Sequence, residues 1–157
     1  MSLLNKASTD KESNKFIEYV HEKGKLLAII LRTNFTKEGI DFFTPNDFSQ
    51  QLGYMNRPKG YKIQPHIHNK VERIINYTQE VLFIKTGIVR VDFYKDDKTY
   101  LLSKILEKGD VILLSSGGHG FEMLERSEII EVKQGPFAGN IDKSRFDVFS
   151  STKLNIK

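Results

Sequence analysis

Apolar and polar residues alternate in short runs along most of the chain, and turn residues separate one run from the next. A period of two is typical of β-strands whose two faces meet different surroundings. The run 88–94 alternates cleanly and ends at the turn 95–98. The same reasoning predicts strands at 26–33, 39–43, 49–56, 60–68, 77–85, 88–94, 100–106, 111–114, 120–124 and 128–134.

Little of the chain has the period of a helix. Phe16, Ile17 and Val20 are spaced as on a short amphipathic helix, which predicts one or two helical turns ending at Gly24. We expect a helical or irregular extension over 1–24, a single domain over 25–150 and a loose tail over 151–157. Many short strands joined by turns predict an all-β sandwich or barrel for that domain.

Composition places the chain among ordinary globular proteins. It has 157 residues, of which 39% are hydrophobic and 28% charged, enough to bury a core. The net charge of +4 is not gathered into a basic block with interleaved aromatic residues, so we expect no nucleic-acid partner. The first twenty residues lack an apolar segment, and the longest apolar run, 26–31, is too short to span a membrane. We therefore expect a cytoplasmic protein with no membrane partner.

Candidate chemistry centres on histidine, because cysteine is absent and any metal must be held by His and carboxylate. Two of the four histidines, His66 and His68, are two residues apart in one predicted strand, so both side chains leave the same face. Neutral imidazole is the commonest metal ligand in proteins. Glu80 opens the next predicted strand on the same face as the apolar Leu82 and Ile84, which places its carboxylate toward the core.

These residues belong to a longer pattern. It consists of Gly60, the two histidines, Glu80, Gly87, a strand led by Gly109, and a Gly-rich turn that reaches His119. The pattern resembles the two signature motifs of the cupin superfamily over residues 60–120. The resemblance implies a cupin double-stranded β-helix, a jelly-roll barrel with the site inside it. It also implies a divalent transition metal (Fe, Mn, Ni, Cu or Zn) held by four ligands: His66, His68, Glu80 and His119.

Three positions depart from that pattern. Eleven residues, 69–79, separate His68 from Glu80, where the family has three or four. Ser115 stands where the second motif has Pro, and His119 arrives one residue early. The insertion 69–79 borders the expected pocket, so we expect it to set the substrate and to supply either a dimer contact or a lid over the barrel mouth.

Five further residues are candidates for contact with a substrate. Gln64 shares a face with His66, and Arg73 has the planar guanidinium that binds carboxylate or phosphate in bidentate fashion. Tyr77 is a candidate acid or hydrogen-bond donor. Phe121 follows His119 by two residues and is expected to line the barrel wall. Lys133 lies on the polar face of the last strand, where its alternative role is an ion pair with Glu80 or Glu131.

Three functions fit these residues. The first is a metal-dependent enzyme acting on a small polar or carbohydrate-like metabolite. The second, from a loose resemblance to sugar-nucleotide 3,4-ketoisomerases, is a metal-free isomerase or epimerase with His66 or His68 as base and Tyr77 as acid. The third is a non-catalytic cupin that binds a small ligand. Glu80 favours the first, since acid–base catalysis by His and Tyr does not require that carboxylate. The resemblance also implies a homodimer.

Overall fold

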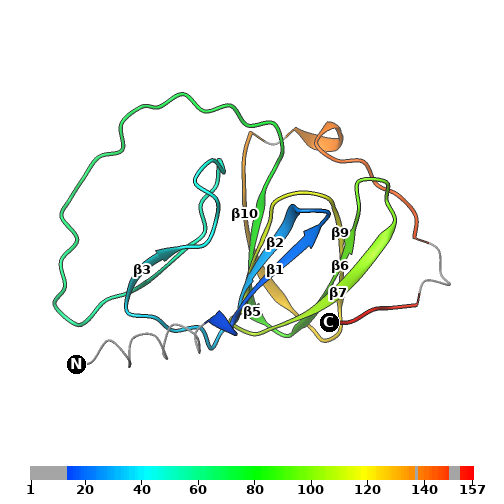
Figure 1. Ribbon diagram of the computed structural model, residues 1–157, viewed down its shortest axis with the longest axis horizontal. Helices are drawn as coiled ribbons and strands as arrows, with labels where there is room; N and C mark the ends of the chain where they lie inside the picture. Colours follow the sequence, from blue (N-terminus) through cyan, green and yellow to red (C-terminus); the bar gives the residue numbers. More distant parts are fainter. Residues whose placement is uncertain (1–13, 137, 149–152) are drawn as a thin grey trace.

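Two antiparallel sheets pack face to face in the computed structural model of the chain, which describes residues 14–136, 138–148 and 153–157 (Figure 1). The prediction of an all-β fold is confirmed. In strand order, the larger sheet contains β1 (Ile17–Glu22), β2 (Lys25–Leu31), β8 (Val111–Leu114), β5 (Glu80–Thr86) and β10 (Glu128–Lys133). The smaller sheet contains β7 (Tyr100–Glu107), β6 (Ile88–Tyr94) and β9 (Gly118–Met123).

The core lies between these sheets. Ile30, Leu82 and Ile112 enter it from the larger sheet, and Val91 and Phe93 enter it from the smaller one; each is at most 5% exposed. Full burial of such a side chain contributes about 1.5–3 kcal/mol. The alternation of each strand therefore decides which of its residues reach the core.

The other face of the larger sheet is partly covered as well. Ile29 and Leu113 lie on that face and pack against Leu52 and Phe43. These two belong to the connection between β3 (Gly39–Phe42) and β4 (Gly53–Asn56), which form a separate hairpin. Burial on both faces explains why 26–31 reads as a continuous apolar run instead of an alternating one.

The helical turns predicted near residues 16–24 are not formed, so that prediction was wrong; residues 1–13 of the expected extension lie outside the described residues. Residues 17–22 are strand β1, which pairs with β2 along the edge of the larger sheet. Lys23 and Gly24 both have positive φ, 48° and 82°, as the tight turn of a two-residue hairpin requires. The few apolar residues of this segment fit the period of a helix as well as that of a strand, and hydrogen bonding to β2 stabilises the strand.

The strand predicted at 60–68 is also absent. Residues 57–79, which we call the arm, contain no strand and pass around one side of the molecule between β4 and β5 (Figure 1). The alternation that predicted a strand is present, but no strand of the described chain lies beside it to supply hydrogen bonds.

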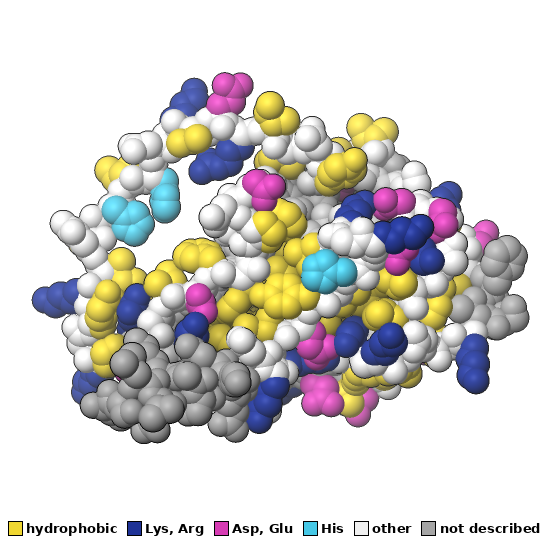
Figure 2. Space-filling model, in the orientation of Figure 1, with side chains coloured by type: hydrophobic (Ala, Val, Ile, Leu, Met, Phe, Trp, Pro, Cys, Tyr) yellow, Lys and Arg dark blue, Asp and Glu magenta, His cyan; other side chains and the backbone are white. Residues whose placement is uncertain are grey.

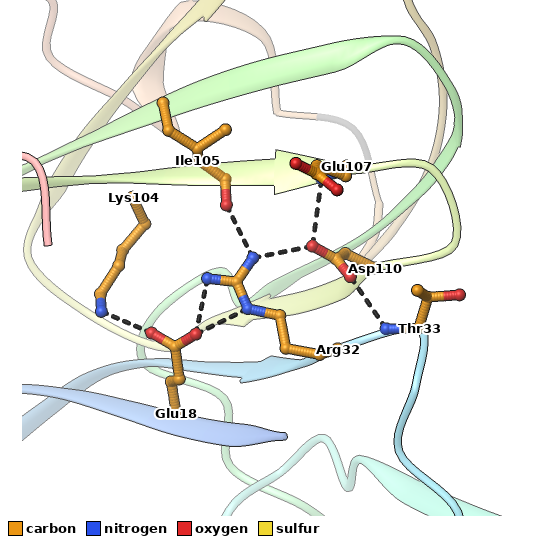
Figure 3. A network of polar contacts seen from close by, with 7 residues as sticks. All are labelled: Glu18, Arg32, Thr33, Lys104, Ile105, Glu107 and Asp110. Carbon is orange, nitrogen blue, oxygen red and sulfur yellow. Dashed lines mark hydrogen bonds and ion pairs between the residues drawn. The ribbon is translucent and has the colours of Figure 1, made fainter. Parts of the chain in front are cut away.

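A polar network fastens the end of β2 to the turn between β7 and β8 (Figure 3). Asp110, 2% exposed, accepts hydrogen bonds from Arg32 Nη1 (2.8 Å) and Thr33 N (2.9 Å). Arg32 also donates to the carbonyl of Ile105 and pairs with Glu18, which in turn pairs with Lys104. The charges satisfy one another, so this network is structural.

The last residues lie along β7, although we expected a loose tail there. Ser103 N donates to Asn155 O (2.9 Å), and Ile156 forms a parallel bridge with Ser103. The contact covers part of an otherwise free sheet edge. Within the described residues, no helix has both the length and the apolar character needed to cross a membrane.

Candidate functional site

Glu80 and His119 meet between the two sheets. Glu80 is the first residue of β5 in the larger sheet, and His119 lies near the start of β9 in the smaller one. His119 Nε2 is 3.2 Å from Glu80 Oε2, with side chains 28% and 15% exposed. Leu82 and Ile84, on the same face of β5, are in the core, so the alternation of the strand carries Glu80 to the inner side. That expectation from the sequence is confirmed.

The surroundings of Glu80 favour its charged form. The hydrogen bond with His119 lowers the pKa of Glu80 below its ordinary value, and partial burial opposes this effect. The charges of His119, Lys133 and Lys143 lower the pKa further. Glu80 is therefore a carboxylate at neutral pH, available to a cation or a proton donor.

The pair lies in a hollow of roughly 370 Å³, within the usual range for a small-molecule site. One wall comes from β5 and β9, and the opposite wall is residues 142–148. Thr78 Oγ1 donates to Asp142 Oδ1 (2.6 Å), and the ring of Phe146 lies 5.2 Å from that of Tyr94, edge to face. These two contacts hold residues 142–148 against the sandwich.

The Gly-rich turn before His119 allows Tyr94 and Phe146 to lie close to the start of β9. A Cβ at Gly118 would lie 3.1 Å from Tyr94 Cβ and 3.3 Å from Phe146 Cζ, tighter than an ordinary contact. Gly117 has φ of 72°, which favours glycine. The glycines therefore let the wall formed by residues 142–148 pack close to β9.

Two further predicted residues lie beside this pair. Phe121 is two residues after His119 on β9, and its ring is 5.4 Å from the imidazole. Lys133, on β10, is directly opposite Glu80 on the neighbouring strand β5. Its Nζ is 3.8 Å from Glu80 Oε1 and 2.7 Å from Glu131 Oε1. The ion pair that we considered for Lys133 is therefore formed.

The remaining predicted residues lie on the arm, at a distance from Glu80 and His119. His66 and His68 do share a face, with rings 5.1 Å apart. Gln64, Arg73 and Tyr77 are exposed along the same segment. Figure 2 shows histidines on the arm, separated from the body by open space. Across the described ranges, no cluster of three or more His, Asp or Glu side chains is placed to hold a metal.

Nothing in the pattern of the sequence indicated that residues 142–148 form a wall of the hollow. Lys143 acts on the charge of Glu80, and Asp142 and Phe146 close the hollow, yet these residues have no regular spacing. Tyr94, at the end of β6, also lines it, and burial raises the pKa of its phenol. Its alternation predicted a strand residue, without indicating that the ring reaches a site.

No family model, curated protein or solved structure matched the chain when it was compared with all three.

Proposed function

We propose that this protein is a metal-binding cupin and an enzyme, acting on a small polar or carbohydrate-like metabolite in the hollow beside Glu80 and His119. The observation that carries the proposal is the 3.2 Å approach of a carboxylate and an imidazole from different sheets, inside a hollow of small-molecule size. Two groups from distant parts of the chain converge on one point, where a ligand has access to both.

The donors of the hollow suit a divalent transition metal such as Fe, Mn, Ni, Cu or Zn. Glu80 offers a carboxylate oxygen and His119 an imidazole nitrogen, but two donors alone do not complete a site. His66 and His68 would supply the other two if the arm came to the hollow. A bound metal would act as a Lewis acid on a substrate oxygen.

The residues around the pair are suited to a polar, anionic substrate. Lys143 and Lys133 place positive charge near Glu80, and the hollow is also lined by Thr78 and Tyr94. Because burial raises the pKa of Tyr94, the phenol stays protonated at neutral pH and is able to donate a hydrogen bond. The wall formed by residues 142–148 limits the access of water from one side.

The test of this proposal is metal binding, measured by calorimetry and by elemental analysis with each of the five metals. We expect one metal per chain, and we expect Glu80→Gln and His119→Gln each to weaken binding at least about tenfold. His21→Gln is the matched control, since His21 is exposed on β1 and should leave binding unchanged. Absence of binding for all five metals, or full binding by Glu80→Gln, would refute the proposal.

One observation favours a second candidate, metal-free acid–base catalysis. Glu80 and His119 already contact each other, and a carboxylate that accepts a hydrogen bond from one ring nitrogen fixes the orientation of the imidazole. In this alternative His119 is the base, in place of His66 or His68. A substrate whose turnover survives exhaustive chelation but is lost in His119→Gln would favour it. A ligand that binds the hollow and is recovered unchanged would favour the non-catalytic cupin instead.

A further inference from the structure

The arm has the sequence of a β-strand but lacks a neighbouring strand. Six of its alternate positions are apolar or aromatic and 47–91% exposed: Tyr61, Ile63, Ile67, Val71, Ile75 and Tyr77. Its backbone pairs with no strand of the described chain. An extended segment with exposed apolar side chains and unpaired peptide groups can pair with another strand, and proteins normally cover such a segment.

The arm has fixed ends. Where it joins β5, Thr78 bonds to Asp142, and Gln79 N donates to Gln134 Oε1 (2.5 Å). Where it begins, it continues directly from strand β4. Between these points it arcs away from the body (Figures 1 and 2). It is an extended loop held at both ends, and its middle is free to contact a partner.

The sandwich has a matching gap beside β9. This strand is the free edge of the smaller sheet. Phe121 and Met123 are 37% and 49% exposed, although they pair with Val91 and Val89, which are fully buried. Paired residues share a face, so apolar side chains that point toward the core side remain uncovered. The smaller sheet therefore offers room for one more strand at the end of β9 that carries Phe121 and Met123, beyond the part near Gly118 where residues 142–148 pack.

Charge favours contact between these two surfaces. The arm has five Lys and Arg residues and one Glu, so its net charge of +4 equals that of the whole chain. Residues 118–133, from β9 in the smaller sheet to β10 in the larger one, have four Glu against two Lys and Arg, a net charge of −2. Three of these Glu are in ion pairs: Glu122 with Arg90, Glu128 with Lys85 and Glu131 with Lys133. Opposite charges on the two surfaces would orient them toward each other before contact.

We propose that the arm of one molecule lies along β9 of a second copy, and that the second copy returns its own arm in the same way. A reciprocal exchange buries both arms in a closed two-fold dimer. Each arm is 23 residues long, from 57 to 79, close to the 20–30 residues a side of a standard interface.

The exchange would also complete the metal site. Alternation places His66 and His68 on the face of an arm strand opposite to Ile63 and Ile67, so only one of these two sets can be turned toward the core. If the histidine face is the one turned inward, His66 and His68 of one copy would face Glu80 and His119 of the other. This part of the inference rests on the proposed metal site, whereas the exchange of arms does not.

The exchange is tested by cross-linking, because the chain has no cysteine. Chains carrying Ile67→Cys are mixed and refolded with chains carrying Glu122→Cys and treated with a short bifunctional maleimide. We expect a covalent heterodimer at twice 18.1 kDa, with equilibrium sedimentation showing a dimer before treatment. Lys108→Cys, exposed in the turn after β7, replaces Glu122→Cys as the matched control and should not cross-link to the arm.

Each outcome of this experiment is decisive. A chain carrying both Ile67→Cys and Glu122→Cys that cross-links within itself as a monomer would place the arm on its own body and overturn the exchange. A chain that sediments as a monomer at all concentrations would also overturn the exchange, even if its arm binds nucleic acid. A dimer that cross-links equally well through Lys108→Cys would overturn it too. All substituted positions are exposed, and circular dichroism verifies folding.

A mixing experiment tests the shared site separately. His66→Ala/His68→Ala chains and Glu80→Gln chains each lack ligands, but a mixed dimer with exchanged arms contains one intact set. We expect metal binding to return on mixing to about half a metal per chain in the mixed dimer. If binding does not return although the wild type binds metal, the histidines do not act across the dimer. If the wild type binds no metal, the proposed function fails while the cross-linking result stands.

Discussion

At the scale of single residues, the contact between Glu80 and His119 joins the two sheets beside the hollow. A carboxylate that is only 15% exposed needs a partner, and this one has His119 Nε2 at 3.2 Å and Lys133 Nζ at 3.8 Å. Lys133 also pairs with Glu131, to which it is closer, so its interaction with Glu80 is weaker than that of His119. The electrostatics of the hollow therefore depend mainly on His119.

Replacement of His119 should change the acid stability of the protein. The pKa of Glu80 lies below its ordinary value of 4.5, so its carboxylate adds stability above that pH and loses this contribution as the pH falls through the folded pKa. In His119→Gln we expect the pKa of Glu80 to rise toward 4.5 and stability to fall less steeply in acid. Carboxyl NMR titration and urea unfolding at several pH values measure both effects. His21→Gln is the control, and an unchanged Glu80 pKa in His119→Gln would contradict the prediction.

At the scale of elements, the strands are fastened at one end by the network around Arg32 and Asp110 (Figure 3). It joins β1, β2, β7 and the turn before β8, which belong to both sheets. Asp110 also accepts a hydrogen bond from Glu107 N, so one carboxylate holds three donors. The hollow beside Glu80 and His119 leaves roughly 370 Å³ of space.

Removal of the Asp110 carboxylate should be costly. Asp110→Ala leaves Arg32 without its most buried partner and orphans two backbone N–H groups, and we expect the free energy of unfolding to fall by about 3 kcal/mol. Urea denaturation measures it. Glu128→Ala, which breaks the exposed pair with Lys85, should cost at most about 1 kcal/mol. Equal losses in the two variants would show that burial does not set the value of these pairs.

At the scale of the whole molecule, charge is divided unevenly. The arm carries the entire net charge, and the remainder of the chain is neutral on balance. The basic character that the composition suggested is therefore a property of one segment. The proposed exchange of arms would carry this basic segment to a second copy of the molecule.

The proposed dimer should weaken in salt. The Debye length is about 30 Å at 0.01 M and about 3 Å at 1 M, so high salt screens attraction between the arm and residues 118–133. We expect the dissociation constant from sedimentation to rise at least several-fold over this range. A variant with Lys62→Gln and Lys70→Gln should dimerise more weakly at low salt and respond less to added salt. A dimer that tightens with salt would show that apolar contacts dominate.

Much of the fold was predictable because strand alternation is a local property. The runs at 80–86, 88–94, 100–107 and 111–114 carry their own signal, and most of the strands were predicted to within a few residues. The same alternation placed Glu80 on the core side. The segment 16–24 was misread because too few apolar residues lay in it to separate the two periods.

The sequence by itself determined which segments have the character of strands, that no cysteine is present, and which face of its strand Glu80 occupies. Only the tertiary structure decided that His119 contacts Glu80, that residues 142–148 wall the hollow, and that the arm stays unpaired. A strand exists only when a second segment supplies its hydrogen bonds, and that segment can be remote in the chain. Residues 61–67 have the pattern of a strand without a partner in their own chain, so the location of His66 and His68 depends on what the arm meets.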